Sequence, residues 1–144
     1  MRRRGPWSPR EVASFLDRTV VPLRLACNGS SGSPILASLW FVADGETLCC
    51  ATQRSARIVE RLRDDPRCAF EVAQDTPPYR GVRGQGRVAI DEGAGPALLE
   101  RLIARYVDPA SAFADWLRAR AHDETALRIE PVRLLSWDFA ERMG

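Results

Sequence analysis

A group of polar residues lies where an apolar stretch of the sequence is followed by a helical pattern. It consists of two hydroxyl residues, a glutamine and two arginines. The segment reads ATQRSARIVERLRDDP, and its polar members are Thr52, Gln53, Arg54, Ser55 and Arg57. A helix start leaves backbone N–H groups free and carries the positive end of the helix dipole, so it receives phosphate readily. Hydroxyls and an arginine fork would add charge-assisted hydrogen bonds. The segment predicts a phosphate site, although an ordinary solvated helix start would contain the same residues.

A second polar group lies on one face of the segment VRGQGRVAI. In a strand over 82–90, Arg83, Gln85 and Arg87 share one face, while the opposite face is apolar and hollowed by glycine. Glycine inside a strand marks a bend, a bulge, or the close approach of a ligand or another backbone. The arginine face therefore predicts either a ligand-facing surface or a solvated one.

The amino-acid composition limits the classes of ligand and partner that can be expected. All 21 basic residues are arginine, so arginine is the only permanent cation available to a phosphate. The net charge of +2 gives no reason to expect nucleic acid. No apolar run reaches the roughly 20 residues that span a bilayer, and the start MRRRGPW lacks the apolar region of a signal peptide. We expect a cytoplasmic protein with a small-molecule substrate and no membrane or nucleic-acid partner.

The sulfur and imidazole groups are few. Cys27, Cys49, Cys50 and Cys68 lie in apolar strand patterns, which predicts small buried hydrophobic residues. The adjacent pair does not have metal-site spacing, and a single histidine, His122, argues against a histidine-based metal site or triad. We predict no metal site, and no residue is identified as catalytic.

Short strands and helices must position these groups. Strands are expected at 22–28, 35–42, 47–52, 68–72, 82–90 and 126–139, and helices at 9–18, 54–63, 98–106 and 113–117. The connections are hairpins rather than βαβ units, which favours one domain over 1–144, a small antiparallel barrel with helices packed outside. Residues 1–7 are expected to be a flexible terminus.

The strand expected at 35–42, ILASLWFV, is apolar on both faces except for Ser38. Such a strand needs cover on both sides, from the core and from a helix or a second subunit. A second subunit over the face that includes Trp40 would make the protein a homodimer.

Four motifs occur in a characteristic order. They are Pro34 with Leu39-Trp40-Phe41 and Asp44-Gly45; Thr52 with Ser55-Ala56-Arg57, Leu62 and Asp65-Pro66-Arg67; the segment Val82 to Val88; and Pro131, Arg133, Trp137 and Asp138. In this order they resemble the pyridoxamine 5'-phosphate oxidase-like family, the FMN-binding split barrels, from about residue 12 to the end. The resemblance implies a mainly β, six-stranded antiparallel split barrel that forms a homodimer with two cofactor sites between subunits.

The resemblance also implies phosphate contacts. Thr52, Ser55 and Arg57 would contact the phosphate of FMN, with Arg54 as the alternative cationic ligand. The related deazaflavin coenzyme F-420 is the alternative cofactor.

The flavin ring would lie on other residues. By resemblance, the strand with Ser38 and Trp40 would line the isoalloxazine ring. Arg83 and Gln85 would approach the same site, from this subunit or the other, and Trp137 would close it.

The implied function is a flavin-type oxidoreductase that transfers hydride to or from a small organic substrate. The alternative is a non-catalytic split barrel that carries or senses a flavin or haem. A third reading is a barrel without a cofactor that serves as a dimeric partner protein.

Overall fold

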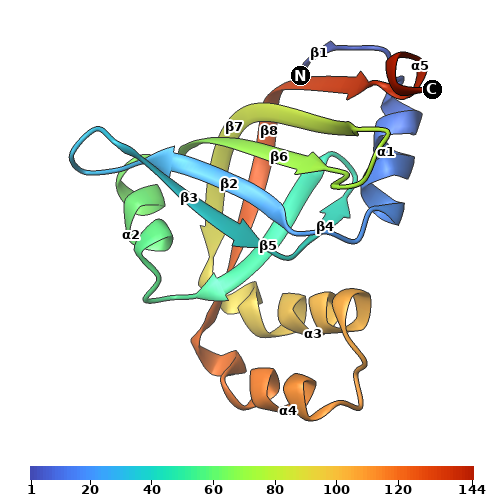
Figure 1. The fold of residues 1–144 in the computed structure, drawn as a ribbon. Coiled ribbons are helices and arrows are strands. Elements are labelled where there is room, and N and C mark those ends of the chain that lie inside the picture. Colours follow the sequence, from blue (N-terminus) through green and yellow to red (C-terminus); the bar gives the residue numbers. More distant parts are fainter.

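The computed structural model describes residues 1–144, in which a single sheet curls on itself (Figure 1). The strands are β1 (Arg2–Arg4), β2 (Leu23–Asn28), β3 (Pro34–Leu39), β4 (Phe41–Asp44), β5 (Thr47–Gln53), β6 (Arg67–Ala73), β7 (Arg80–Asp91) and β8 (Glu124–Asp138). The α-helices are α1 (Pro9–Arg18), α2 (Arg57–Asp64), α3 (Gly95–Tyr106), α4 (Ala112–Ala119) and α5 (Ala140–Met143). Two short 3-10 helices are η1 (Glu92–Ala94) and η2 (Ala121–Asp123).

The sheet nearly closes because its two ends are neighbours in the chain. The strand order is β3-β2-β6-β7-β8-β5-β4, and every neighbouring pair in it is antiparallel. Only Trp40 separates β3 at one end from β4 at the other, so a bend there bridges the two ends. The predicted mainly β split barrel is confirmed. The expected strand at 35–42 is divided at this bend into two strands with different partners.

The N-terminus differs from the expected flexible segment. β1 lies parallel to β8 and pairs Arg2–Arg4 with residues 133–135. β5 pairs with β8 only as far as Ile129, so the far part of that β8 edge has no partner from β5. Unpaired edge N–H and C=O groups attract another strand, and β1 takes this place.

Two helices complete the main core and a third covers the outside of the barrel. Apolar residues of α1 and α2 pack with the inner faces of the strands around Phe41 and Phe70. α3 instead packs outside, where Leu98 and Leu102 meet Cys49 of β5. No helix combines the length and apolar character needed to cross a membrane.

The start and end of α1 are both satisfied. The Ser8 backbone N–H donates to Glu11 Oε2 at 2.7 Å, and the Glu11 backbone N–H donates to Ser8 Oγ at 3.2 Å, so the two residues form a capping box. At the other end, the Arg105 guanidinium of α3 donates to the carbonyl oxygens of Leu16 and Asp17, both at 2.7 Å. α3 therefore holds α1 as well as the sheet.

β7 has the two-faced pattern expected from its sequence. Val82 and Val88 point into the core, and Arg83 and Arg87 point outward. Gly86 lies at a bulge in the β7–β8 ladder, where Val132 has no partner on β7. The glycines of this strand thus accommodate backbone approach within the barrel.

The four cysteines are buried and unpaired, as predicted, and we expect them to be inert in the folded protein. Burial raises the pKa of the Cys68 thiol to about 11, and it also raises the pKa values of Cys27, Cys49 and Cys50. Because the thiolate is the reactive form, a disulfide reagent at about pH 8, near the usual thiol pKa, should label native protein very slowly. All four thiols should react after denaturation. Rapid labelling of the native chain would contradict this packing.

Candidate functional site

The outer face of the sheet contains an open depression of about 760 Å³. Its floor is formed by outward-facing residues of β2, β6, β7 and β8, with Ala26, Ala69 and Leu135 among them. Arg24, Arg83 and Arg133 stand around these apolar groups. Strand alternation places these side chains together because each is on the outer face of its strand. The combination of apolar floor and cationic rim suits a ligand with an apolar body and an anionic group.

Arg83 contacts Glu71 and Trp137, of which Trp137 is also a predicted site residue. Its Nε lies 3.4 Å from Glu71 Oε2 on the neighbouring strand, and its guanidinium carbon lies 4.2 Å from the ring centroid of Trp137. Gln85, two residues along β7, also lines the depression. Ser38 is exposed on β3, on the same outer face as the lining residue Leu36. The depression therefore gathers Arg83 and Gln85, with Trp137 in contact with Arg83.

The start of α2 holds the second group of predicted residues. Its N-cap is Ala56, so no side chain caps the first N–H groups of the helix. Ser55 and Arg57 are exposed and Thr52 is half-buried, and none of the three side chains forms a hydrogen bond or an ion pair. These donors remain available to a ligand, in the arrangement that receives an anion at a helix start.

The two candidate arginines differ in their contacts. One guanidinium nitrogen of Arg54 donates to the His122 carbonyl oxygen at 2.8 Å and lies 3.3 Å from Asp123 Oδ1. These contacts tie Arg54 to η2. Arg57 has no carboxylate partner, so its charge is free for a ligand.

Gln53 is engaged inside the protein rather than at the surface. Its Nε2 donates to Glu124 Oε1 at 2.9 Å, while Glu124 Oε2 is buried without a partner. Burial raises the pKa of the Glu124 carboxyl, against the opposing effect of the Gln53 hydrogen bond. Thr52 pairs across the ladder with Thr125, whose buried hydroxyl has no partner in the chain. The end of β5 and the start of β8 thus form a polar patch, in which two oxygens of β8 have no partner.

Trp40 lies against the helices instead of in the depression. Its ring stacks on Tyr106 with centroids 5.0 Å apart and meets the edge of Phe113 at 6.2 Å. The Tyr106 hydroxyl donates to the Val21 carbonyl oxygen at 2.8 Å and accepts from the Phe41 N–H at 3.2 Å, which ties α3 to the bend after β3. Within one chain, the cover for Trp40 is α3 and α4.

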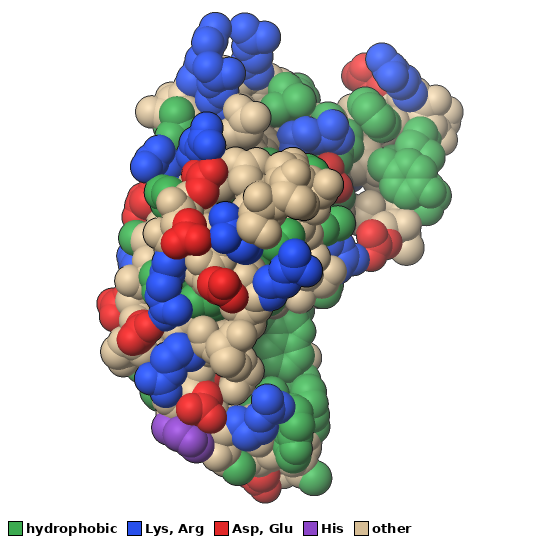
Figure 2. All heavy atoms as spheres, turned by 90° about the vertical axis from the view of Figure 1, so that its left-hand side faces the viewer, with side chains coloured by type: hydrophobic (Ala, Val, Ile, Leu, Met, Phe, Trp, Pro, Cys, Tyr) green, Lys and Arg blue, Asp and Glu red, His purple; other side chains and the backbone are tan.

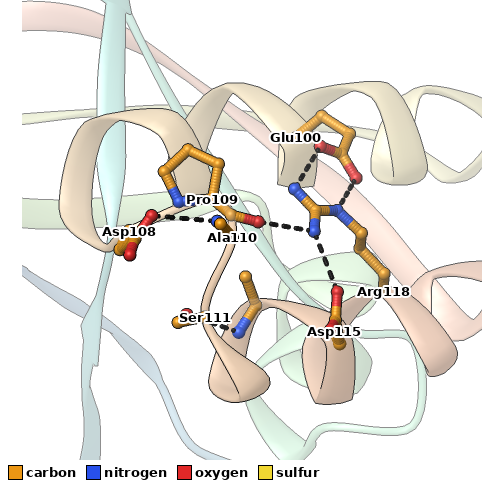
Figure 3. A network of polar contacts seen from close by, with 8 residues as sticks. Glu100, Asp108, Pro109, Ala110, Ser111, Asp115 and Arg118 are labelled. Atoms are coloured by element: carbon orange, nitrogen blue, oxygen red, sulfur yellow. Dashed lines mark hydrogen bonds and ion pairs between the residues drawn. The ribbon is translucent and has the colours of Figure 1, made fainter.

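Arg118 holds α4 in this position (Figure 3). Its guanidinium donates to Glu100 of α3 at 2.8 Å and to the Pro109 carbonyl oxygen at 2.8 Å, and it pairs with Asp115 at 3.2 Å. Ser111 caps the helix by accepting from the Ala114 N–H. With α4 held in this way, Phe113 and Trp116 are about half exposed at the lower end of the molecule, where apolar side chains gather in Figure 2.

One chain does not unite the two groups of predicted residues. The depression is lined by β1, β2, β3, β6, β7 and β8 and by no residue of β5 or α2. Thr52, Ser55 and Arg57 are therefore not part of the surface that holds Arg83 and Gln85. Arg24 and Arg133 were not predicted as lining residues, although the alternation of β2 and β8 places both on an outer face.

Comparison with known proteins agrees with this architecture. A family model described as pyridoxamine 5'-phosphate oxidase matches residues 9–138. Conserved hypothetical protein Rv2991 of Mycobacterium tuberculosis is 28% identical, with a TM-score of 0.79 over 92% of this chain and 86% of that one. No curated protein matches.

Two more distant solved structures share the fold. An F420 reductase is 24% identical, with a TM-score of 0.72 over 84% of this chain and 93% of that one. HutZ, a haem storage protein of Vibrio cholerae, is 16% identical, with a TM-score of 0.66 over 87% of this chain and 91% of that one. The family match extends over most of the chain and coincides with the curled antiparallel sheet. The chain belongs to the pyridoxamine 5'-phosphate oxidase family.

Proposed function

We propose that the protein binds a flavin-type cofactor, FMN or the deazaflavin coenzyme F-420, at a homodimer interface and uses it to transfer hydride to or from a small organic substrate. The observation that carries the proposal is the uncapped start of α2, where the charge of Arg57 and the hydroxyls of Thr52 and Ser55 are free. Hydroxyls, N–H groups and a guanidinium are donors that suit a phosphate group. The residues present therefore fit the phosphate end of the cofactor.

The rest of the site fits the other end of such a molecule. The cofactor, when bound, supplies the hydride chemistry, and the protein binds and orients it. Arg83 and Gln85 present hydrogen-bond donors beside apolar floor residues, a setting suited to a planar heteroaromatic ring with carbonyl oxygens. Trp137, stacked under the Arg83 guanidinium, holds that arginine over the outer face.

A second copy of the chain would bring the α2 donors and the Arg83 face together in one site. The α2 donors and the Arg83 face are not lined up within one subunit, yet both suit parts of one ligand. In a two-fold dimer, the α2 start of one subunit can meet the Arg83 face of its partner, and symmetry then produces two equal sites. Leu36, 70% exposed on β3, is an apolar residue that such an interface would cover.

Among the alternatives, flavin is better supported than haem. Haem iron takes an axial histidine, cysteine, methionine or tyrosine, and none of these residues lines the depression. His122, the single histidine, lies exposed on η2. A non-catalytic flavin carrier remains the second candidate, because no side chain here is placed as a catalytic acid, base or nucleophile.

Two measurements test the function. The purified protein should be yellow or take up added FMN or coenzyme F-420, and the bound cofactor should lose its absorbance when a suitable reductant such as a reduced nicotinamide is added. A bound cofactor that exchanges no electrons with reduced nicotinamides or other hydride donors would favour the carrier. Failure to bind either cofactor would contradict the proposal.

We also expect a dimer in solution. Sedimentation velocity at micromolar concentration should give the mass of two chains, because the exposed apolar side chain of Leu36 on β3 needs cover. A monomer at that concentration would contradict the shared site.

A further inference from the structure

The depression holds more positive charge than the proposed cofactor ring needs. Its lining contains five arginines, Arg2, Arg4, Arg24, Arg83 and Arg133, and one acidic residue, Glu71. The only ion pair among these residues is the one between Arg83 and Glu71. Four guanidinium groups thus face one depression without a carboxylate partner.

The N-terminal arm supplies two of these charges in a defined way. Because β1 is paired with β8, alternation turns Arg2 and Arg4 toward the depression and turns Arg3 the other way, where it pairs with Glu46. Arg2 is opposite Arg133 in the ladder, so like charges are placed next to each other. Like-charge pairs directly opposite in a sheet are destabilising. Figure 2 shows basic side chains gathered at the end of the molecule where β1 lies.

The depression is poorly suited to lie directly against the same depression of a second subunit. That contact would bring two unbalanced sets of arginines together across the two-fold axis, whereas contact with the α2 start of a partner would not. An anionic ligand seated in the depression would neutralise them and would be held by charge-assisted hydrogen bonds.

We propose that this depression is an anion-binding subsite, built in part by the N-terminal arm, for a ligand that joins at least two negative charges to an apolar portion. The inference rests on the proposed function for the position of the ring, and it adds a second anionic contact separate from the phosphate at α2. Carboxylate and phosphate groups both match the arginine fork. They can belong to an acidic side chain of the cofactor or to an anionic substrate.

A small molecule is favoured over nucleic acid. The basic surface is a depression with apolar floor residues and a glutamate among its arginines, and the chain as a whole carries a net charge of only +2. Binding to a nucleic acid backbone would instead favour an extended basic surface.

The test compares Arg2→Gln/Arg4→Gln and Arg133→Gln with wild type and with Arg10→Gln, a control at an exposed arginine of α1 outside the depression. Coenzyme F-420, its deazaflavin chromophore without the phosphate and glutamate groups, FMN and citrate are titrated separately at low and high salt. We expect the depression variants to lose about 10-fold or more in affinity for the anion concerned, with a shallower salt dependence. The Arg10 variant should match wild type.

The ligands separate the two sources of the anion. Loss for coenzyme F-420, with unchanged affinity for both its chromophore and FMN, assigns the subsite to the acidic side chain of the cofactor. Unchanged F-420 and FMN affinities with weakened citrate binding assign it to a separate anionic ligand. If wild type binds no flavin or deazaflavin but its citrate affinity depends on Arg2 and Arg4, the subsite stands and the proposed function fails. Equal affinities in all variants, or tighter binding of a single-stranded oligonucleotide than of any small anion, would overturn the inference.

Discussion

Replacing Arg57 with alanine is expected to weaken FMN binding about 10- to 150-fold, because a charge-assisted hydrogen bond contributes roughly 1.5–3 kcal/mol. Arg57 has no carboxylate partner at the start of α2, where the helix lacks a side-chain cap. A phosphate placed there would receive the guanidinium, backbone N–H groups and the neighbouring hydroxyls together. Fluorescence-quenching titrations of wild type and variant with FMN measure the loss.

Riboflavin and Arg54 provide the controls. Riboflavin lacks the phosphate, so its affinity should be nearly the same for wild type and Arg57→Ala. Arg54→Ala removes the contacts to His122 and Asp123 and should lower stability more than FMN affinity. Equal losses for FMN and riboflavin in Arg57→Ala would mean general damage. A large FMN-specific loss in Arg54→Ala, with none in Arg57→Ala, would move the anchor to Arg54.

Gly86→Val should destabilise the protein by about 3 kcal/mol or more, at the upper end of overpacking effects. A Cβ at Gly86 would lie 2.3 Å from the Glu130 carbonyl oxygen and 3.0 Å from Pro131 Cα. Both neighbours are backbone atoms of β8 at the bulge, so relief requires movement of the ladder rather than of a side chain. Thermal unfolding should show a melting temperature lower by about 10 °C.

Gly93→Ala is the matched control for this substitution. A Cβ at Gly93 would meet only the Asp91 side chain, at 3.7 Å, which is an ordinary contact. Its melting temperature should remain near that of wild type. If Gly86→Val had the same melting temperature as Gly93→Ala, Gly86 would not be needed for the close packing of β7 on β8.

Local patterns predicted most of the fold. The helix at 9–18 and the alternation of β7 were each readable because neighbouring residues determine them. The cysteine-bearing strands likewise followed from the side-chain period of two. The break between β3 and β4 at Trp40 could not be predicted in this way. Both halves of 35–42 have the same apolar character, and only their pairing partners at opposite ends of the sheet distinguish them.

The candidate site was less accessible to sequence reasoning. The contribution of Arg2 and Arg4 depends on a parallel pairing with residues 133–135, more than a hundred residues away in the chain. No local pattern indicates such a pairing. Likewise, the engagement of Arg54 by η2 depends on a tertiary contact, so the sequence left Arg54 open as the alternative to Arg57 for the phosphate.

In the proposed dimer, one cofactor is held by the α2 start of one subunit and the Arg83 face of the other. The most direct test of this shared site is an FMN titration of wild type, Arg57→Ala, Arg83→Gln, and a mixture of the two variants unfolded and refolded together. Wild type should bind one FMN per chain, and each variant alone should bind weakly. Random pairing of the variants in a two-fold dimer should restore about a quarter of the tight sites, because one site of each mixed dimer then has both arginines. No tight sites in the mixture, or no FMN binding by wild type, would contradict the account.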